Sequence, residues 1–328
     1  MKILIIQTAF IGDVILTTSL VEKLSAFYPE AKIDFLLRKG NESILANNPH
    51  INEILIWDKK NRKYRNLLFI LRQVRIRKYD VVVNVQRFFT TGMLAVFSGG
   101  KQIIGFDKNP ISFLFTKKVK HVIGTKENPV HEVQRNLALI EELTDGKMVR
   151  PKIYPSEKDF QKVKTEGSYA TIAPASVWFT KQLPPQKWLE AIALLPKGMI
   201  VYLIGGKEDI PLCELIRKSS GRENIINLAG QLSLMESAAL MKNAQMNFVN
   251  DSAPLHLASA VNAPVTAVFC STIPTFGFGP LSDQSTVVET KLALDCRPCG
   301  LHGFRQCPKG HFRCAEIDAA EIVKSLTS

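Results

Sequence analysis

The 328 residues of the chain exceed what one typical domain needs and suffice for two domains, each with its own hydrophobic core. The composition, 46% hydrophobic and 22% charged, is that of a folded globular protein and excludes a disordered chain. A formal net charge of +12 predicts an anionic partner, for which nucleic acid, anionic lipid and a phosphorylated substrate are the candidates.

The first residues, MKILIIQTAFIGDVIL, place a lysine before an apolar run, as a signal peptide does. Asp13 interrupts this run and no small-residue cleavage site follows, so the segment is better interpreted as a buried first strand. No stretch of the sequence reaches the roughly eighteen uninterrupted apolar residues of a membrane-spanning helix. We therefore expect a soluble, cytoplasmic protein.

The first half of the chain alternates short apolar runs with segments of helical patterning, which predicts a parallel sheet covered by helices on both faces. A helix is expected to begin near Gly12 and Asp13 and to run through Leu24. The predicted strands are Ile3–Ile6, Ile33–Leu37, Ile54–Trp57, Val81–Val85 and Gln102–Ile104.

Asp13 lies in the turn between the first strand and the first helix. Its carboxylate either caps the helix or accepts a proton from an acceptor hydroxyl while a sugar–phosphate bond breaks. We favour the second interpretation because of the motifs that follow downstream.

A basic segment, 59–78, contains nine lysines and arginines and no acidic residue. Within it Leu67, Leu68, Leu71 and Val74 recur at helical spacing, which favours a solvated helix whose apolar stripe packs on a sheet. A second interpretation, compatible with the first, is a basic surface that faces anionic lipid headgroups or an acidic glycolipid. Nucleic acid is disfavoured, because no helix-turn-helix, zinc-finger or RNP-type motif accompanies the charge.

The polar segment 147–167, with Pro151 and Pro155, predicts the connection between an N-terminal domain, 1–155, and a C-terminal domain, 156–328. A second α/β series follows, and two doubly wound domains in tandem are expected to place their strand carboxyl ends across a common cleft. Its predicted strands are Tyr169–Ile172, Met199–Ile204, Ile225–Asn227, Met246–Val249 and Val265–Phe269.

Three nucleotide-binding motifs are missing. The sequence has no G-x-x-x-x-G-K-[ST], no G-x-G-x-x-G after the first strand and no D-x-D. The first two absences weaken the case for a P-loop NTPase or a dinucleotide oxidoreductase. The third predicts that any sugar-nucleotide chemistry proceeds without a metal ion.

Three segments of the second half have the character of a nucleotide-diphosphate site, because each follows a predicted strand. A plain turn after a strand, a helix cap and a satisfied core histidine are the structural alternatives for these residues. The candidate residues are Ser176, Thr180 and Lys181 in the first segment, Glu208 and Asp209 after a Gly-Gly turn, and Asp251, Ser252 and His256 at a helix start.

Four segments together resemble the bacterial heptosyltransferases of glycosyltransferase family 9, and they occur in the right order over almost the whole chain. These segments are residues 1–18 with the IGDVILTT motif, His131–Leu137, Leu228–Leu234 and Asn250–Ala258. The resemblance implies a GT-B fold of two Rossmann-like domains and an inverting, metal-independent enzyme. It further implies an ADP-L-glycero-D-manno-heptose donor in the C-terminal domain, a lipid A–Kdo core acceptor in the N-terminal domain, and a place on the inner face of the inner membrane.

Residue roles follow from the resemblance by motif. It implies that Asp13 is the general base, that Ser176 and Lys181 bind the diphosphate, that Glu208 or Asp209 contacts the ribose, that Leu232 lies near the adenine, and that Asp251, Ser252, Ala253 and His256 bind the diphosphate and nearby sugar. The acceptor or membrane face is assigned to Arg62, Arg65 and Arg72. Two positions depart from the family pattern, Ala253 in place of a glycine and Gln182 in place of a basic residue.

A cysteine-rich loop, 296–314, carries the spacing C-x2-C-x7-C-x6-C. Three interpretations are open: a structural zinc site, reduced thiols packed in a loop, and a disulfide. Catalysis requires none of them. The four residues are Cys296, Cys299, Cys307 and Cys314.

Three alternative functions stay open at this point. The chain is a transferase of the same fold for a different nucleotide sugar, a GT-B-type epimerase acting on UDP-N-acetylglucosamine, or a non-catalytic protein that binds sugar nucleotides or nucleic acid through its basic surface. Together, Asp13, Lys181 and Asp251 argue against the non-catalytic alternative.

Overall fold

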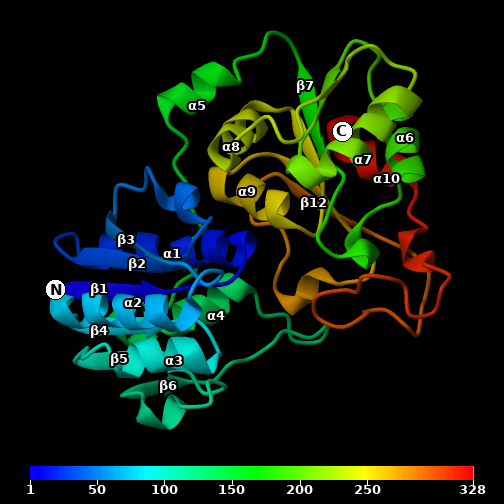
Figure 1. Ribbon diagram of the computed structural model, residues 1–328. Helices are drawn as coiled ribbons and strands as arrows, with labels where there is room; N and C mark the ends of the chain where they lie inside the picture. The colour runs from blue at the N-terminus through cyan, green and yellow to red at the C-terminus, as the bar shows by residue number, and fades with distance from the viewer. Residues whose placement is uncertain (328) are drawn as a thin grey trace. The chain divides into compact units, whose positions relative to one another are not determined.

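The computed structural model describes residues 1–327. The chain forms two compact units, unit 1 from Met1 to Tyr154 and unit 2 beginning at Pro155 (Figure 1). The division lies next to the boundary expected from the polar, proline-containing segment. Each unit is a doubly wound α/β domain with its own sheet.

Unit 1 contains a parallel six-stranded sheet in the order β3-β2-β1-β4-β5-β6 within the described part of the chain. All five predicted strands are present. The strands are β1 (Lys2–Ile6), β2 (Lys32–Arg38), β3 (Ile51–Trp57), β4 (Val81–Asn84), β5 (Gln102–Phe106) and β6 (Lys117–Val119). Because β1 lies beside both β2 and β4, the chain direction across the sheet reverses there, and ligands of such sheets bind beyond the strand carboxyl ends at this point.

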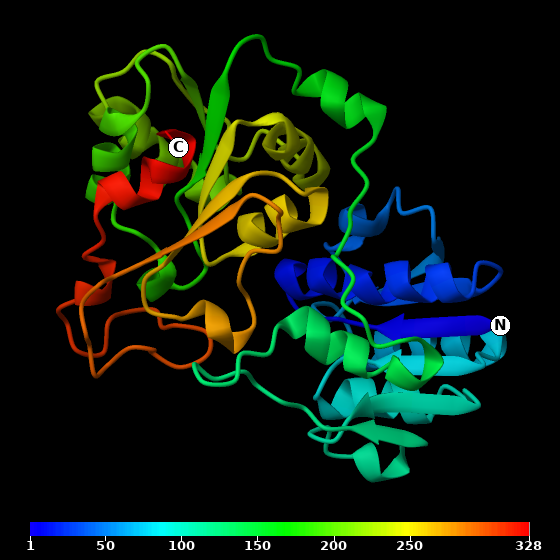
Figure 2. The same ribbon diagram turned by 180° about the vertical axis from the view of Figure 1, so that it is seen from behind.

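Helices cover both faces of this sheet. Figure 2 shows α1 and α4 on one face, and α2 and α3 lie on the other. Their bounds are α1 (Ile11–Phe27), α2 (Lys63–Arg77), α3 (Phe89–Val96) and α4 (Glu132–Ala138). With both faces covered, β1 must be apolar on both sides, and Ile3, Leu4, Ile5 and Ile6 are all fully buried.

Helix α1 begins at Ile11, slightly before the predicted start, and ends at Phe27. The reason is local: the Asp13 carboxylate accepts a hydrogen bond of 3.1 Å from the backbone N–H of Phe10 and so closes the first turn. Ten of its residues are buried, from Val14 to Leu24, so the helix is a central packing element of unit 1.

Helix α2 packs on its sheet through Ile70 and Val74, with Leu67 and Leu71 partly buried against the same core. The predicted apolar stripe is wrong at Leu68, whose side chain is 59% exposed. The reason is helical geometry: Leu67, Leu71 and Val74 cluster on one side, whereas Leu68 is turned away by about 100° from Leu67. Within residues 1–327 no helix combines the length and apolar character needed to cross a membrane.

Unit 2 repeats the same topology, with a parallel six-stranded sheet in the order β12-β11-β10-β7-β8-β9 in its described residues. The five predicted strands form, and β12 adds an edge strand that the sequence patterning did not indicate. The strands are β7 (Tyr169–Ala173), β8 (Ile200–Leu203), β9 (Ile225–Asn227), β10 (Met246–Asn250), β11 (Val265–Phe269) and β12 (Ser285–Glu289).

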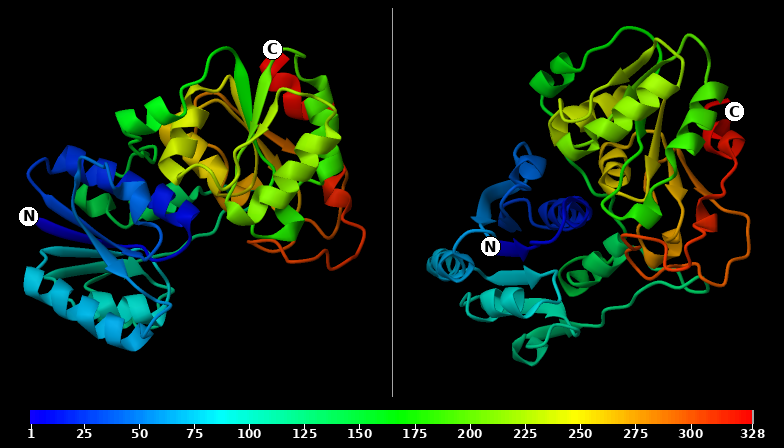
Figure 3. Two further views of the ribbon diagram at one scale, coloured as in Figure 1. Left: turned by 45° about the horizontal axis from the view of Figure 1, so that its top comes forward. Right: turned by 45° about the vertical axis from the view of Figure 1, so that its right-hand side comes forward.

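Helices α8 and α9 lie on one face of this sheet and α6, α7 and α10 on the other, as Figure 3 shows. Their bounds, with that of the first helix of the unit, are α5 (Glu157–Lys162), α6 (Pro185–Leu194), α7 (Ile210–Ser219), α8 (Leu234–Asn243), α9 (Ala253–Val261) and α10 (Ala319–Thr327). The core contains Trp188, Phe248 and Ile322, all at most 1% exposed. Burying an aliphatic or aromatic side chain of this kind contributes about 1.5–3 kcal/mol, so α10 is an integral part of the unit.

Candidate functional site

Asp13 lies just beyond the carboxyl end of β1. This is the point in the sheet of unit 1 where successive strands are added first on one side of β1 and then on the other. Burial, with a smaller contribution from charge repulsion by Glu132, raises the pKa of Asp13 to about 6, although the hydrogen bond from the Phe10 N–H and the charge of Arg38 act in the opposite sense. Its carboxylate also helps to cap α1, because it accepts a hydrogen bond from the backbone N–H of the N-cap residue, Phe10. Capping and proton transfer are therefore compatible in one carboxylate, and a group with a pKa near neutrality suits a general base.

Glu132 opens α4, the helix that packs against α1. Its carboxylate accepts hydrogen bonds from Arg135, at 2.8 Å from Nε and also from Nη2. The sequence segment His131–Leu137 contributes to the family resemblance, and the sequence alone predicts no role for Glu132. The structure brings it close enough to Asp13 to influence the pKa of that carboxyl.

Lys59 is the residue of the basic segment that reaches the loop after β1. Its Nζ donates to the Thr8 carbonyl oxygen at 3.0 Å and to Thr8 Oγ1 at 2.7 Å, and it lies 4.7 Å from the centroid of the Trp57 ring. Burial and the neighbouring charges of Arg38 and Lys63 lower the pKa of Lys59 to about 8.

The predicted acceptor-face arginines are placed differently from Lys59. Arg62 precedes α2, whereas Arg65 and Arg72 lie on the helix, and all three side chains are exposed. The structure therefore brings Lys59, and not these three, to the loop that leads to Asp13.

In unit 2, Lys181 and Asp251 come together. Lys181 Nζ lies 2.7 Å from Asp251 Oδ2, and Thr272 Oγ1 donates to the same oxygen at 2.6 Å. The Asp251 side chain is 4% exposed, so the ion pair holds the lysine charge in a nearly buried position. Removing one partner of such a pair typically costs about 3–5 kcal/mol, because the other charge is left buried.

Asn250 connects two of the predicted segments. Its Oδ1 accepts from the Leu183 backbone N–H at 3.0 Å, and its Nδ2 donates to the Pro174 carbonyl at 2.7 Å. Both ends of the loop after β7 are thereby held to the carboxyl end of β10. Sequence reasoning missed this role, although a polar residue at the last position of a buried strand is a signal for it.

Helix α9 begins directly after this point. Ser252 is its N-cap, but the serine side chain makes no cap hydrogen bond, and Ala253 and Pro254 form the first turn. The alternative that Ser252 merely caps the helix therefore does not hold. His256 follows in the same turn, is buried, and lies with its ring centroid 6.3 Å from that of Phe278. A helix start of this kind favours an anion.

The other residues of the loop after β7 have structural partners. Thr180 is buried, and its hydroxyl oxygen accepts from the Ser271 hydroxyl at 3.0 Å and from the Phe304 N–H at 2.8 Å. Ser176 is half-buried, and its carbonyl accepts from Gln182 Nε2 at 2.6 Å. Gln182, which replaces the basic residue of the family pattern, thus closes the turn that contains Ser176.

The Gly-Gly turn after β8 is shaped by Asp209, whose Oδ2 accepts from the Gly206 N–H at 2.8 Å. A Cβ at Gly205 would lie 2.8 Å from that carboxylate, so the position requires glycine. Glu208 is exposed, and Leu232 is half-buried in the next loop, which is joined to the turn by a 2.9 Å hydrogen bond from Gly230 to Gly205. Of the two predicted acids, Glu208 is the one with a solvent-facing side chain.

The alternative disulfide in loop 296–314 is wrong, because its four cysteines are free thiols, whereas the structural zinc site stays a prediction. All six cysteines are free thiols, and residues 1–327 contain no group of three or more His, Cys, Asp or Glu side chains placed to hold a metal ion. Cys314 packs into the hydrophobic core, where burial raises the pKa of its thiol to about 11, whereas Cys299 Sγ donates to the Cys296 carbonyl. The arrangement is that of reduced thiols packed in a loop.

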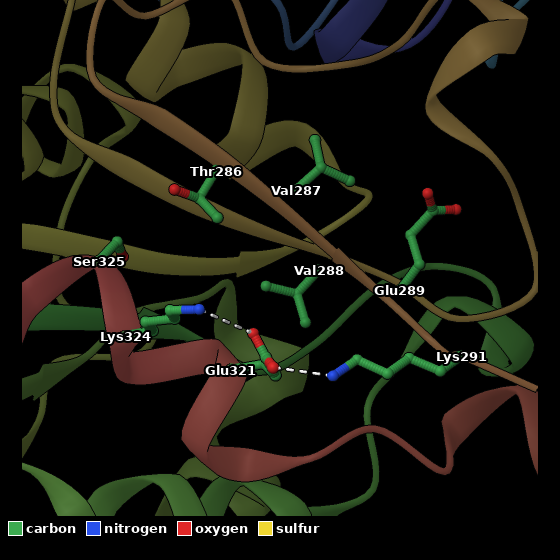
Figure 4. A pocket seen from close by; sticks show the side chains of 8 residues that line it. All are labelled: Thr286, Val287, Val288, Glu289, Lys291, Glu321, Lys324 and Ser325. Carbon is green, nitrogen blue, oxygen red and sulfur yellow. Dashed lines mark hydrogen bonds and ion pairs between the residues drawn. The ribbon is translucent and has the colours of Figure 1, made fainter.

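A surface pocket lies between the edge strand β12 and helix α10 (Figure 4). Glu321 lines the pocket and forms ion pairs with Lys291 at 2.8 Å and with Lys324 at 3.9 Å. None of the residues predicted for the donor site lines this pocket. It therefore has no part in the arrangement around Lys181 and Asp251.

The chain is similar to proteins of one known family. A model of glycosyltransferase family 9 (heptosyltransferase) matches residues 68–302, which is more than half of the chain. Lipopolysaccharide heptosyltransferase 3 of Escherichia coli is 29% identical over 279 residues, covering 80% of this chain and 82% of the relative. Lipooligosaccharide heptosyltransferase 2 of Haemophilus influenzae is 25% identical over 322 residues and covers 88% of both chains.

Among solved structures, ADP-heptose LPS heptosyltransferase II of E. coli is similar with a TM-score of 0.81 at 22% identity, covering 100% of this chain and 98% of that one. At this level of identity the likeness concerns the fold. It confirms the predicted α/β class with two Rossmann-like domains of the GT-B type.

Proposed function

The chain belongs to glycosyltransferase family 9, and from this membership and the geometry of its two units we infer that it transfers heptose from ADP-L-glycero-D-manno-heptose to the inner core of lipopolysaccharide. That the chain is a glycosyltransferase follows from the family itself. The donor, the acceptor, inversion at the anomeric carbon and independence from metal ions are the proposed part.

The single observation that carries the proposal is the start of α9 in unit 2. An uncapped helix N-terminus, a nearly buried lysine and the loop after β7 lie together there. Backbone N–H groups and a fixed ammonium suit a diphosphate, because both stabilise negative charge without a metal ion. We assign the diphosphate to Lys181, Ser252 and Ala253, the nearby sugar to His256, the ribose to Glu208, and the adenine to the loop of Leu232.

Unit 1 supplies the base. Asp13, ionised above its raised pKa, accepts the proton of the attacking acceptor hydroxyl. The acceptor oxygen forms a bond to the anomeric carbon, the bond from that carbon to the phosphate oxygen breaks, and its electron pair leaves with ADP. Lys181 and the N-terminus of α9 stabilise the charge that develops on the leaving diphosphate.

The acceptor assignment rests on charge. A lipid A–Kdo core glycolipid is anionic, and the chain carries a net charge of +12 with its basic segment in unit 1. We assign the acceptor or membrane face to Arg62, Arg65 and Arg72, and we place the protein peripherally on the inner face of the inner membrane.

The test measures ADP release from ADP-heptose, with and without a heptose-acceptor core glycolipid, in the presence of EDTA. Acceptor-dependent release is expected from the wild type, and Asp13→Asn, which keeps a hydrogen-bond acceptor for α1, is expected to reduce it by about 10²–10⁴-fold. The matched control is Glu30→Gln, an exposed acid in the same unit, which should leave the rate unchanged.

Other outcomes would redirect the assignment. ADP binding without acceptor-dependent release would overturn heptose transfer and point to another sugar or acceptor within the family. Conversion of UDP-N-acetylglucosamine without any acceptor would support an epimerase instead. Loss of activity in EDTA that added metal restores would contradict the metal-independent mechanism.

A further inference from the structure

The solvent-facing side of α2 carries large apolar side chains that nothing in unit 1 covers. Tyr64 is 72% exposed, Leu68 59%, Phe69 58% and Ile76 77%. Helix α2 is the outer layer on its face of the sheet (Figure 1). Single exposed apolar residues are ordinary, but four on one short helix are not.

Helical geometry places these four side chains on one strip. At 3.6 residues per turn, Tyr64, Leu68, Ile76 and Phe69 fall in that order within an arc of about 140°. The anchoring residues Ile70 and Val74 lie on the opposite side and are buried. The helix is therefore apolar on its sheet side and apolar again on its solvent side.

Arginines share the exposed arc. Arg75, Arg72 and Arg65 interleave with the apolar residues at angles of about 20°, 80° and 100° from Tyr64. All three side chains are exposed. The neighbouring Arg77 is directed elsewhere, since its guanidinium pairs with Glu53 at 2.6 Å.

This combination has a characteristic partner. Large apolar side chains interleaved with arginines suit the boundary between lipid headgroups and acyl chains, where apolar groups insert and guanidinium groups meet phosphates. A second copy of the chain fits poorly, because a two-fold contact through this strip would bring the same three arginines face to face. The absence of any acidic residue in 59–78 also leaves nothing within the segment to neutralise them.

We propose that the exposed strip of α2 is a membrane-insertion surface that docks the protein on an anionic lipid bilayer. Leu68, Phe69 and Ile76 enter the interfacial layer, Tyr64 lies at its edge, and Arg65, Arg72 and Arg75 contact lipid phosphates. This surface is distinct from the donor site, and it deepens the proposed function in one respect, because a glycolipid acceptor is held in the same bilayer.

The first experiment measures flotation of the full-length protein with vesicles of phosphatidylcholine alone or mixed with phosphatidylglycerol. The wild type should bind the anionic vesicles. Two variants separate the contributions: Leu68→Ser/Phe69→Ser/Ile76→Ser keeps the charge, and Arg65→Gln/Arg72→Gln/Arg75→Gln keeps the apolar residues. Each triple variant should bind the anionic vesicles about tenfold more weakly than the wild type, or weaker still. Added salt should weaken only the part of the binding that depends on the arginines.

A second readout reports insertion itself. Tryptophan at the strip, Phe69→Trp, should be quenched by brominated lipid above the background of the three native tryptophans. Leu215→Trp is the matched control, because Leu215 is 53% exposed on α7 of unit 2. Equal quenching of the two variants, or vesicle binding that neither triple variant reduces, would overturn the proposal. Self-association that depends on the strip, without vesicle binding, would assign it to a second copy instead.

Failure of this proposal can be told apart from failure of the proposed function. The triple serine variant should retain the wild-type melting temperature and the wild-type rate on a delipidated, water-soluble core acceptor. If the wild type transfers heptose but both triple variants bind vesicles normally, the insertion surface is wrong and the transferase stands. If vesicle binding behaves as expected but no sugar is transferred, the insertion surface stands and heptose transfer is wrong.

Discussion

Asp13 owes its near-neutral pKa to burial first and to Glu132 second. The two acids come from motifs more than a hundred residues apart, and the packing of α4 against α1 brings them together. Arg135 binds Glu132 in a two-point interaction, which orients the Glu132 carboxylate. In this arrangement Glu132 is a positioning residue that acts on the base through its charge.

A pH profile tests this coupling. If Asp13 is the base, kcat/KM should rise with pH through about 6, because the carboxyl must lose its proton to act, and should level off above that value. Glu132→Gln removes a negative charge that raises the pKa of Asp13, so the rising limb should move to lower pH. Glu30→Gln should leave the profile in place, and an unmoved limb in Glu132→Gln would refute the coupling.

The cysteine-rich loop matters at the scale of elements because it lies directly against the loop after β7. Gly303, with φ of 75°, approaches so closely that a Cβ there would be 2.9 Å from Thr180 Oγ1 and 3.2 Å from Lys181 Cγ. The Phe304 N–H donates to Thr180 Oγ1 nearby. The loop thereby supports the segment that carries Lys181.

Two glycine substitutions distinguish the effect of the close contact between Gly303 and Thr180 from the effect of backbone strain. Gly303 and Gly310 have nearly the same φ, 75° and 74°, but a Cβ at Gly310 would meet nothing within 4 Å. Gly303→Ala should weaken ADP binding several-fold, because the displaced loop shifts Lys181, whereas Gly310→Ala carries only the strain of about 1 kcal/mol. Isothermal titration with ADP measures both, and equal losses would contradict support from the loop.

At the scale of the whole molecule, two units with separate sheets and cores make up the chain. All contacts found around Lys181, Asp251 and the start of α9 come from residues of unit 2. The donor site is therefore expected to form within that unit alone.

A fragment beginning at Pro155 tests this independence. It should unfold cooperatively and bind ADP within about threefold of the full chain, since its core and the residues that we assign to the diphosphate all lie in unit 2. Adenosine, which lacks the diphosphate, is the control ligand and should bind at least about tenfold more weakly to both proteins. A folded fragment that binds adenosine as tightly as ADP would move the diphosphate away from α9.

Local patterns were enough to predict five strands of each sheet and to place Asp13, Lys181 and Asp251 in segments that follow strands. Each of these features depends on residues close in sequence: a buried run forms a strand, and the loop after a parallel strand opens at one edge of the sheet. The edge strands β6 and β12 escaped detection, because neither has a continuous apolar run: β6 begins with two lysines, and Val287 of β12 is 36% exposed.

Contacts between distant segments could not be predicted in this way. Glu132 beside Asp13, Asn250 clamping the loop after β7, and Thr272 bonded to Asp251 all join residues that only packing brings together. The same holds for Leu68. Its helical spacing can be seen in the sequence, but only the packing of α2 on the sheet determines that Leu68 lies on the exposed face. Periodicity is a property of neighbours along the chain, whereas a pKa, an ion pair or an uncovered helix face depends on which surfaces meet in three dimensions.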